Sequence, residues 1–450
     1  MAATDSATPE TTAQAAPGAG AASPHATHSV WRWIPTLYFG QGIPYVAVMT
    51  LSVILYKNLG VSNTDIALYT SWLYLPFVVK PLWSPFIDMF RRKRWWIVWL
   101  ELLIGAAFAA VALTLPMANF FQLSLAVFWL LAFSAATHDI ASDGYYMLAL
   151  DGHQQAAYVG FRSTFFRLSM ITGQGALVYL AGKLTELTGN TAAAWSIVFF
   201  LLGAMFLALF AWHALVLPRP ASDRPNVPRD ADGRALPIVA SFFAVFAKFL
   251  RKPGIGTTLA FLLLYRFGES QLVKIAPVFL LDGPERGGLG LSTATVGIVY
   301  GTLGVVALSA GGLLSAWLIA RDGMQRWLWP MALAINVPNV VYVYLAMALP
   351  ANIELIGTLI AVEQFGYGFG FTSYVLYMIM TAKGEHQTAH YAICTGFMAL
   401  GMMLPGMPAG WLQTQLGYSS FFIWVCVATI PSFIMTALIR IEPGFGLKLD

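Results

Sequence analysis

The stretch LPFVVKPLWSPFIDMFRRKRWW, residues 75–96, indicates the class of protein. It begins as an apolar run with a single lysine, Lys80, and ends in Asp88 and the basic loop Arg91–Arg94. Trp95 and Trp96 then open the next apolar run. Lys and Arg collect in the cytoplasmic loops of membrane proteins, and Trp collects at the membrane interface. The stretch therefore predicts a membrane span that ends at the cytoplasmic face.

The composition extends this interpretation to all 450 residues. Hydrophobic residues make up 58% of the chain, charged residues 10%, and the mean hydropathy is +0.68. Soluble domains carry roughly 25% charged residues, so 25 basic and 21 acidic side chains are too few for a wetted surface. This composition excludes a secreted disulfide scaffold, a nucleic-acid binder and an ordinary cytosolic enzyme. The two cysteines, Cys394 and Cys426, lie in apolar runs and are interpreted as small buried hydrophobes.

Apolar runs separated by short polar breaks predict an all-α membrane protein, with twelve transmembrane helices in two six-helix pseudo-repeats. The expected spans are 33–56, 66–88, 95–115, 121–148, 158–181, 194–217, 255–280, 293–319, 327–349, 353–381, 388–411 and 418–440. The expected domains are a disordered cytoplasmic tail (1–32), an N-terminal bundle (33–217), a cytoplasmic linker (218–252), a C-terminal bundle (253–442) and a cytoplasmic tail (443–450).

Basic loops set the expected orientation. The loop Arg91–Arg94, the central linker and the pair Arg321 and Arg326 all fall on one side if twelve spans are right. Both termini are therefore expected in the cytoplasm. The halves also echo each other, because Phe39-Gly40 and Phe267-Gly268 hold matching places in the first and seventh spans. Such a repeat suits a transporter whose halves rock around a central site.

Glycines spaced four residues apart occur in two later spans, as Gly297 with Gly301 and Gly406 with Gly410. Small residues at this spacing let two helices approach closely. We expect ordinary helix packing at both pairs.

Charges inside the spans need a partner or a function, because an ionisable group at the bilayer centre costs at least about 2.5–3.5 kcal/mol. Lys80 in the second span and Glu101 in the third lie at similar depth, and we expect them to pair as a structural lock. Asp88, Arg91 and Arg94 form the turn between these spans and are expected to have a structural or gating role.

The fourth span carries Asp139 and Asp143, which lie four residues apart and so share one face. Counting along the fifth span places Arg167 at the depth of Asp139 and Arg162 at the depth of Asp143. The group is either a structural clamp or a polar site where a substrate or a proton displaces a bond. His138 projects away from Asp139 and is interpreted as a packed histidine.

The second half carries its own membrane-depth charges. Arg266, Glu269 and Lys274 lie in the seventh span and Glu363 in the tenth. Gln41 in the first span is expected at the same level. Of these, Arg266, Glu269 and Glu363 are expected near mid-membrane, and three charged groups at that depth favour a functional site over a stabilising one. Metal-ligand spacing, a nucleophile with its base and a Walker motif are all missing from the sequence, so we predict no enzyme, no metal and no cofactor.

These residues resemble the major facilitators and, within them, the muropeptide permeases of the AmpG type, a group related to acetyl-coenzyme A transporters. The matching stretches are Gly40-Gln-Gly-Ile-Pro44, Lys80-Pro-Leu-Trp-Ser-Pro-Phe-Ile-Asp88, Ser134-Ala-Ala-Thr-His-Asp139 with Asp143, Phe166-Arg167-Leu, Leu264-Tyr-Arg-Phe-Gly-Glu269, and Glu363 with Gly366, Gly368 and Gly370. The resemblance covers residues 33–440. This chain departs from the family in length, since such permeases have additional helices after the twelfth. It also departs at Lys274, which has no counterpart in the family.

The resemblance implies a proton-driven importer of the bacterial inner membrane that carries N-acetylglucosaminyl-anhydromuramyl sugar or peptide for cell-wall recycling. It also implies a cavity lined by spans one, four, seven and ten. We assign substrate binding to Gln41, Arg167, Arg266, Lys274 and Glu363, and proton coupling to Asp139, Asp143, Glu269 and Glu363. Structural or gating roles go to Lys80, Asp88, Arg91, Arg94, Glu101 and Arg162.

Three alternatives stay open at this point. They are a siderophore or other organic-anion permease on the same scaffold, an exporter of drugs or metabolites, and a membrane sensor that moves nothing. The expected partners are a small-molecule substrate, protons and the lipid bilayer, with no nucleic acid, and the expected state is a monomer.

Overall fold

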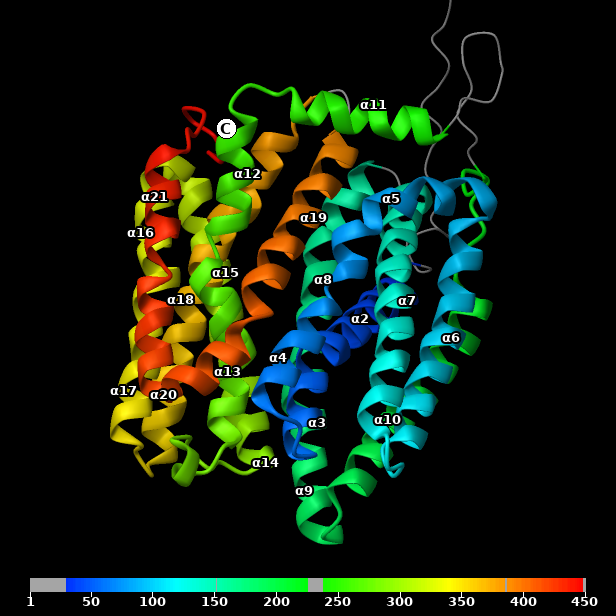
Figure 1. The fold of residues 1–450 in the computed structure, drawn as a ribbon. Helices are drawn as coiled ribbons and strands as arrows, with labels where there is room; N and C mark the ends of the chain where they lie inside the picture. Colours follow the sequence, from blue (N-terminus) through cyan, green and yellow to red (C-terminus); the bar gives the residue numbers. More distant parts are fainter. Residues whose placement is uncertain (1–29, 151, 226–237, 385–386, 448–450) are drawn as a thin grey trace, which may run out of the picture.

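The computed structural model describes residues 30–150, 152–225, 238–384 and 387–447, and within these ranges all regular structure is helical (Figure 1). The expected N-terminal tail falls almost entirely outside the described residues, as do the middle of the linker and the last three residues. The described helices form a bundle of spans that run up and down (Figure 1).

Six spans make up the first half. They consist of α2 (Ile34–Val46) continued through a π-helical turn by α3 (Ser52–Asn58), α4 (Asn63–Trp72) with α5 (Leu75–Phe90), α6 (Lys93–Thr114), α7 (Phe120–Ala149), α8 (Gly152–Met170) continued by α9 (Val178–Thr188), and α10 (Thr191–Val216). Helix α11 (Ile238–Leu250) follows and lies across one end of the bundle (Figure 1).

Six further spans make up the second half. They consist of α12 (Ile255–Leu264) with α13 (Phe267–Leu281), α14 (Thr293–Val296) continued through a π-helical turn by α15 (Val305–Asp322), α16 (Met324–Asn336) with α17 (Val340–Ala348), α18 (Ile353–Ala382), α19 (Gln387–Gly406) with the start of α20 (Ala409–Val427), and the rest of α20 with α21 (Ile430–Leu438). The eleventh and twelfth spans separate at Gly417, whose φ of 73° breaks the helix.

The twelve expected spans correspond to these segments. Within the described ranges, seven helices are long and apolar enough to cross a membrane by length and composition. The second, fifth, seventh, tenth and eleventh spans fall short, because kinks break them or polar residues and glycines dilute them. Four of these five carry charges at membrane depth, namely Lys80, Arg162 with Arg167, Arg266 with Glu269 and Lys274, and Glu363. These weaker spans therefore bring charged groups into the bundle, together with the third and fourth spans, which carry Glu101, Asp139 and Asp143.

The two ends of the bundle differ. We name the end with α11 and the C-terminal residues the near side, and the end with α9 and α14 the far side (top and bottom of Figure 1). On the far side the halves contact each other through α4 with α20, α9 with α14, α3 with α13, and the two π-helical turns at 171–177 and 297–304.

Glycines allow the close approach on the far side. A Cβ at Gly301 would lie 1.8 Å from the backbone oxygen of Gln174, and one at Gly410 would lie 2.0 Å from that of Asn63. The prediction that these spaced glycines lie at tight helix contacts is confirmed. Both contacts join the first half of the chain to the second. The four-residue spacing of the glycines does not by itself indicate which helices they join.

Candidate functional site

The first group of buried charges lies in the first half and centres on Asp139 of α7. Its Oδ2 accepts a hydrogen bond from Lys80 Nζ at 2.7 Å, and its Oδ1 accepts one from the side-chain amide of Gln41. One turn further, Asp143 pairs with Arg162 at 2.8 Å. Two carboxylates thus face two cations, which makes the group neutral overall.

This arrangement corrects two expectations. The predicted Lys80–Glu101 pair is wrong, because Lys80 contacts Asp139, on the face of α5 that points to α7. The predicted match between Arg162 and Asp143 is confirmed, but Arg167 does not reach Asp139. Residue counting estimates depth in the membrane, whereas the pairing also depends on the direction in which each side chain leaves its helix.

Glu101 belongs to a separate network in the core of the first half. Its Oε1 lies 2.6 Å from His213 Nδ1 of α10 and 3.5 Å from His138 Nε2 of α7, and all three side chains are fully buried. Thr36 lies 2.9 Å from the other ring nitrogen of His213. The packed location predicted for His138 is confirmed, although it lies beside a carboxylate rather than among apolar groups.

The second group of buried charges lies in the second half, where the seventh span is broken. Arg266 separates α12 from α13 with φ −112° and ψ 22°. Its guanidinium donates a hydrogen bond to the hydroxyl of Tyr367, and it lies 5.1 Å and 4.9 Å from the ring centroids of Tyr367 and Phe371. Cations held over aromatic faces are stabilised by the ring quadrupole. The break therefore presents a positive group on an aromatic surface.

One carboxylate, Glu269, lies within electrostatic range of this arginine, and a second, Glu363, lies within range of Glu269. Glu269 is in the first turn of α13 and is 1% exposed, and neither of its oxygens has a hydrogen-bond partner among the residues that the structure describes. Glu363 of α18 accepts one hydrogen bond, from Gln364 at 3.0 Å, and lies within electrostatic range of Glu269. Buried polar atoms are nearly always satisfied in native structures. Glu269 is thus a buried carboxylate that would be stabilised by a proton or a ligand.

Two predicted substrate residues cross from one half to the other. Lys274 of α13 is 1% exposed, donates to Thr70 Oγ1 at 2.9 Å, and lies 5.1 Å from the ring of Tyr74. Arg167 of α8 donates to the backbone oxygen of Ser309 at 3.1 Å. Both side chains therefore contact the opposite half. Gln41, by contrast, lies with Asp139 and not with Arg266.

The remaining predicted residues lie at the near side. Arg94 donates to the backbone oxygens of Ala214 and Leu217, so it fastens the start of α6 to the end of α10. Arg91 lies 5.6 Å from the ring of Trp95. The side chain of Asp88 is not among those that the structure describes.

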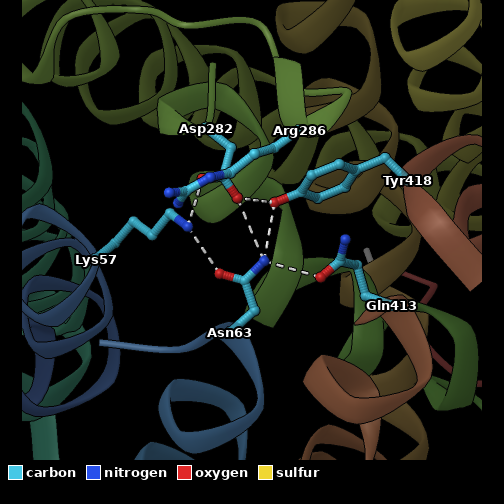
Figure 2. Close-up of polar contacts among 6 residues, drawn as sticks. All are labelled: Lys57, Asn63, Asp282, Arg286, Gln413 and Tyr418. Atoms are coloured by element: carbon cyan, nitrogen blue, oxygen red, sulfur yellow. Dashed lines mark hydrogen bonds and ion pairs between the residues drawn. The ribbon is translucent and has the colours of Figure 1, made fainter. Parts of the chain in front are cut away.

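A polar cluster on the far side joins the halves (Figure 2). Lys57, at the end of the first span, pairs with Asp282 at 2.6 Å and donates to Asn63 Oδ1 at 2.8 Å. Asn63 donates to Gln413 at 2.8 Å and to the hydroxyl of Tyr418 at 3.1 Å, and that hydroxyl in turn donates to Asp282. We name these five residues the far-side lock.

A cavity of about 330 Å³ adjoins the far-side lock, and Arg286 also lines it. The sequence analysis did not predict this cluster, because it singled out charges within the spans, whereas Lys57 and Asp282 lie at the ends of spans. A signal was present, since Lys57 ends the first helix of the first half and Asp282 follows the first helix of the second half. In a repeated fold, equivalent positions of this kind lie close to the same axis.

Comparison with known proteins identifies the class. The model of the Major Facilitator Superfamily matches residues 36–382. The chain belongs to this superfamily, and it is a multi-pass membrane protein and a secondary transporter.

The relatives narrow the resemblance. The chain is 24% identical over 417 residues to the anhydromuropeptide permease of Escherichia coli (strain K12), covering 90% of this chain and 78% of the permease. It is 23% identical over 407 residues to putative transporter AmpG 4 of Rickettsia conorii, covering 87% and 92%. A crystal structure of a D-xylose-proton symporter superposes with a TM-score of 0.68 at 12% identity, over 95% of this chain and all of the symporter. The resemblance to AmpG-type transporters is confirmed, and the symporter shares the fold.

Proposed function

We propose that the protein is a proton-coupled importer of a bacterial inner membrane, and that its substrate is an anhydromuropeptide, the N-acetylglucosaminyl-anhydromuramyl sugar with or without peptide. The observation that carries the coupling is Glu269, a buried carboxylate without a hydrogen-bond partner among the described residues, beside Arg266. Such a group suits the binding and release of a proton. The near side is the cytoplasmic side in this proposal, because the basic loops lie there, and the working unit is a monomer.

The substrate class follows from Arg266 and its surroundings. A guanidinium with its fork of donors recognises a carboxylate, and a muropeptide offers one on its lactyl or peptide group. Tyr367 and Phe371 supply an aromatic wall, and aromatic rings combine apolar area with, in tyrosine, a polar hydroxyl. This combination suits an amphipathic solute such as a sugar with an acidic side group. The name of the Escherichia coli relative, anhydromuropeptide permease, agrees with this substrate class.

In this proposal each of the two buried groups contributes to both substrate binding and proton exchange. Arg266, Lys274 and Glu363 bind the substrate, together with Gln41 and Arg167. Asp139, Asp143 and Glu269 exchange the proton, as Glu363 does when substrate is absent. Alternating access arises as the two bundles, 33–217 and 253–442, rock about this site while residues 218–252 connect them. Lys80 and Arg162 hold the first-half carboxylates in place between steps.

Uptake into proteoliposomes tests the proposal. With an acidic exterior, the wild type should accumulate labelled anhydromuropeptide. Glu269→Gln and Asp139→Asn should each abolish accumulation but keep substrate exchange across the membrane without a gradient, because each keeps the shape of the side chain and removes its proton. Glu354→Gln, an exposed carboxylate on the same helix as Glu363, is the matched control and should transport normally.

Two results would count against the proposal. If Glu269→Gln and Asp139→Asn both accumulate substrate at wild-type levels, the coupling assignment is wrong. If the wild type ignores anhydromuropeptide but accumulates a siderophore or another organic anion, the second candidate is right. The observation that favours this second candidate is the pair of basic side chains, Arg266 and Lys274, along the seventh span.

A further inference from the structure

A cavity on the near side of the first half is lined by an excess of positive charge. It has a volume of about 210 Å³ and lies between the start of α6 and the segment after α10. Arg92, Arg94 and Arg219 line it together with one carboxylate, Asp223. Arg219 lies within electrostatic range of Arg94, so like charges face each other there. Such an arrangement is unfavourable unless an anion offsets it.

The protein itself uses two of these four groups. The carboxylate of Asp223 accepts hydrogen bonds from the backbone N–H groups of Lys93 at 2.7 Å and Arg94 at 3.1 Å, so it caps α6. The guanidinium of Arg94 donates to the backbone oxygens of Ala214 and Leu217. Asp223 is thus the one carboxylate among the residues that line the cavity, and its oxygens are directed at the start of α6.

The other two arginines have no such use. Arg92 and Arg219 are exposed, and neither guanidinium group makes a hydrogen bond or ion pair with any residue that the structure describes. Trp95 and Trp99 line the same cavity and are 40% and 48% exposed, one helical turn apart. Exposed tryptophans at the end of a span lie at the level of the lipid headgroups. The cavity thus combines two available guanidiniums with a wall that faces lipid.

The corresponding loop of the second half is built differently. Arg321 and Arg326 both pair with Asp322, at 2.8 Å and 3.8 Å, and Trp327 donates to the same carboxylate at 2.9 Å. Both arginines therefore have a carboxylate partner within the protein, and Asp322 offsets one of the two positive charges. The available positive charge of the first half is therefore a local feature and not a general property of the near side.

We propose that this cavity binds the phosphate headgroup of an anionic glycerophospholipid. Arg92 and Arg219 pair with the phosphate oxygens, which guanidinium groups bind through paired hydrogen bonds, and Trp95 and Trp99 pack against the glycerol backbone and the first carbons of the acyl chains. A lipid fits better than a soluble anion, because the two rings would otherwise border an aqueous site. Basic pockets at the ends of membrane helices are suited to such headgroups.

Native mass spectrometry of the full-length protein in detergent tests the proposal. The titrants are phosphatidylglycerol and phosphatidylcholine with identical acyl chains. The wild type should retain phosphatidylglycerol in preference. Arg92→Gln combined with Arg219→Gln should weaken that binding about 30-fold, at about 1 kcal/mol for each charge and 1.4 kcal/mol for each factor of ten. Arg92→Lys should keep most of the preference, because the charge remains.

The matched control is Arg321→Gln combined with Arg326→Gln, which removes the same charge from the same side. It should leave phosphatidylglycerol binding within about twofold of the wild type. An equal loss in this control, or an unchanged preference in the Arg92/Arg219 variant, would overturn the proposal. So would displacement of the lipid by inorganic phosphate at millimolar concentration, since the site would then take a free anion. An unchanged unfolding temperature of each variant separates these results from misfolding.

Discussion

A carboxylate buried inside a helical bundle is stable only with partners that stay in place, and Glu101 is the clearest case in this protein. It lies 2.6 Å from His213 Nδ1 and has no exposed surface. Removing one partner of a buried hydrogen bond leaves the other unsatisfied and costs about 1–3 kcal/mol. Stability in this region therefore depends on a contact between α6 and α10.

Glu101→Leu should accordingly lower the free energy of unfolding by about 2 kcal/mol, since the buried His213 loses a hydrogen-bond partner. Glu101→Gln should cost less, because the amide oxygen can still accept a hydrogen bond. The measurement is denaturant unfolding in detergent, with the exposed Glu354→Leu as control, for which no change is expected. Wild-type stability in Glu101→Leu would mean that Thr36 alone satisfies His213.

Asp282 in the far-side lock yields a second prediction. Asp282→Asn removes the charge that offsets Lys57, so the closed far side should lose about 3 kcal/mol relative to the open one. A buried reporter, Ser71→Cys in a background without Cys394 and Cys426, should then be alkylated about 100-fold faster from the far side. Lys183→Gln, which breaks an exposed pair within the first half, should leave the rate unchanged.

The pH dependence of the lock follows from the same contacts. Burial raises the pKa of Asp282, but the hydrogen bonds from Lys57 and Tyr418 outweigh it and hold the pKa below the ordinary 3.8. Opening the far side exposes the carboxyl to water, so its pKa returns toward that ordinary value. Protonation therefore favours opening, and the contribution of Asp282 to closure is complete above about pH 4 and lost as the pH falls through the lowered pKa. Reporter alkylation should not change through Asp282 between pH 5 and 8, and a change there that Asp282→Asn removes would contradict this account.

At the scale of elements, the far side is held by backbone contacts that glycine permits. The π-helical turns at 171–177 and 297–304 meet where Gly301 faces Gln174. A Cβ at Gly301 would lie 1.8 Å from a backbone oxygen, a distance that no rotamer change relieves. The two turns cannot stay in contact if a side chain is added there.

Gly301→Ala should therefore separate the fifth and eighth spans on the far side and raise alkylation of the Ser71→Cys reporter. Gly256→Ala is the matched control, because a Cβ at Gly256 meets nothing within 4 Å. It should leave the reporter unchanged and slightly raise stability, as alanine favours helix over glycine by roughly 1 kcal/mol. An unchanged reporter rate in Gly301→Ala would mean that the turns separate at no cost to closure.

Element positions were predictable, whereas side-chain partners were only partly so. Apolar runs and basic loops sufficed to place twelve spans, because each span must cover the bilayer thickness. Counting residues to estimate membrane depth paired Arg162 with Asp143 correctly but failed for Lys80. The helical period shows which residues share a face of one helix, but it does not show which faces of two helices meet. The break at Arg266 was not foreseen, because the surrounding apolar residues continue without a proline or glycine until Gly268.

At the scale of the whole molecule, the structure is closed on the far side, and a crosslink can test this state. Thr64 of α4 and Thr414 of α20 lie in opposite halves with their hydroxyls 3.4 Å apart. Thr64→Cys with Thr414→Cys replaces each hydroxyl by a thiol of similar shape, and the pair should form a disulfide under mild oxidation. The crosslinked protein should stop transporting and recover on reduction. Either single variant should transport throughout, and full transport by the crosslinked protein would rule out opening at this place.

The conformation itself was beyond sequence reasoning. Residues such as Asn63, Gln413 and Tyr418 are ordinary polar residues near the ends of spans, and no spacing pattern indicates that they meet across 350 positions. Their partnership arises from the relative position of the two halves. That position differs between the states of a rocking transporter, while the sequence is the same in all of them.

The far-side lock also bears on how affinity is measured. A solute arriving from the far side binds only the fraction of molecules in which the lock is open. If the lock favours closure by about 2.8 kcal/mol, that fraction is about 1%, and the apparent dissociation constant is about a hundredfold larger than that of the open site. A variant with a weaker lock would then bind solute more tightly without any change at Arg266. Affinity in this protein is therefore set at Lys57 and Asp282 as well as at the residues that touch the solute.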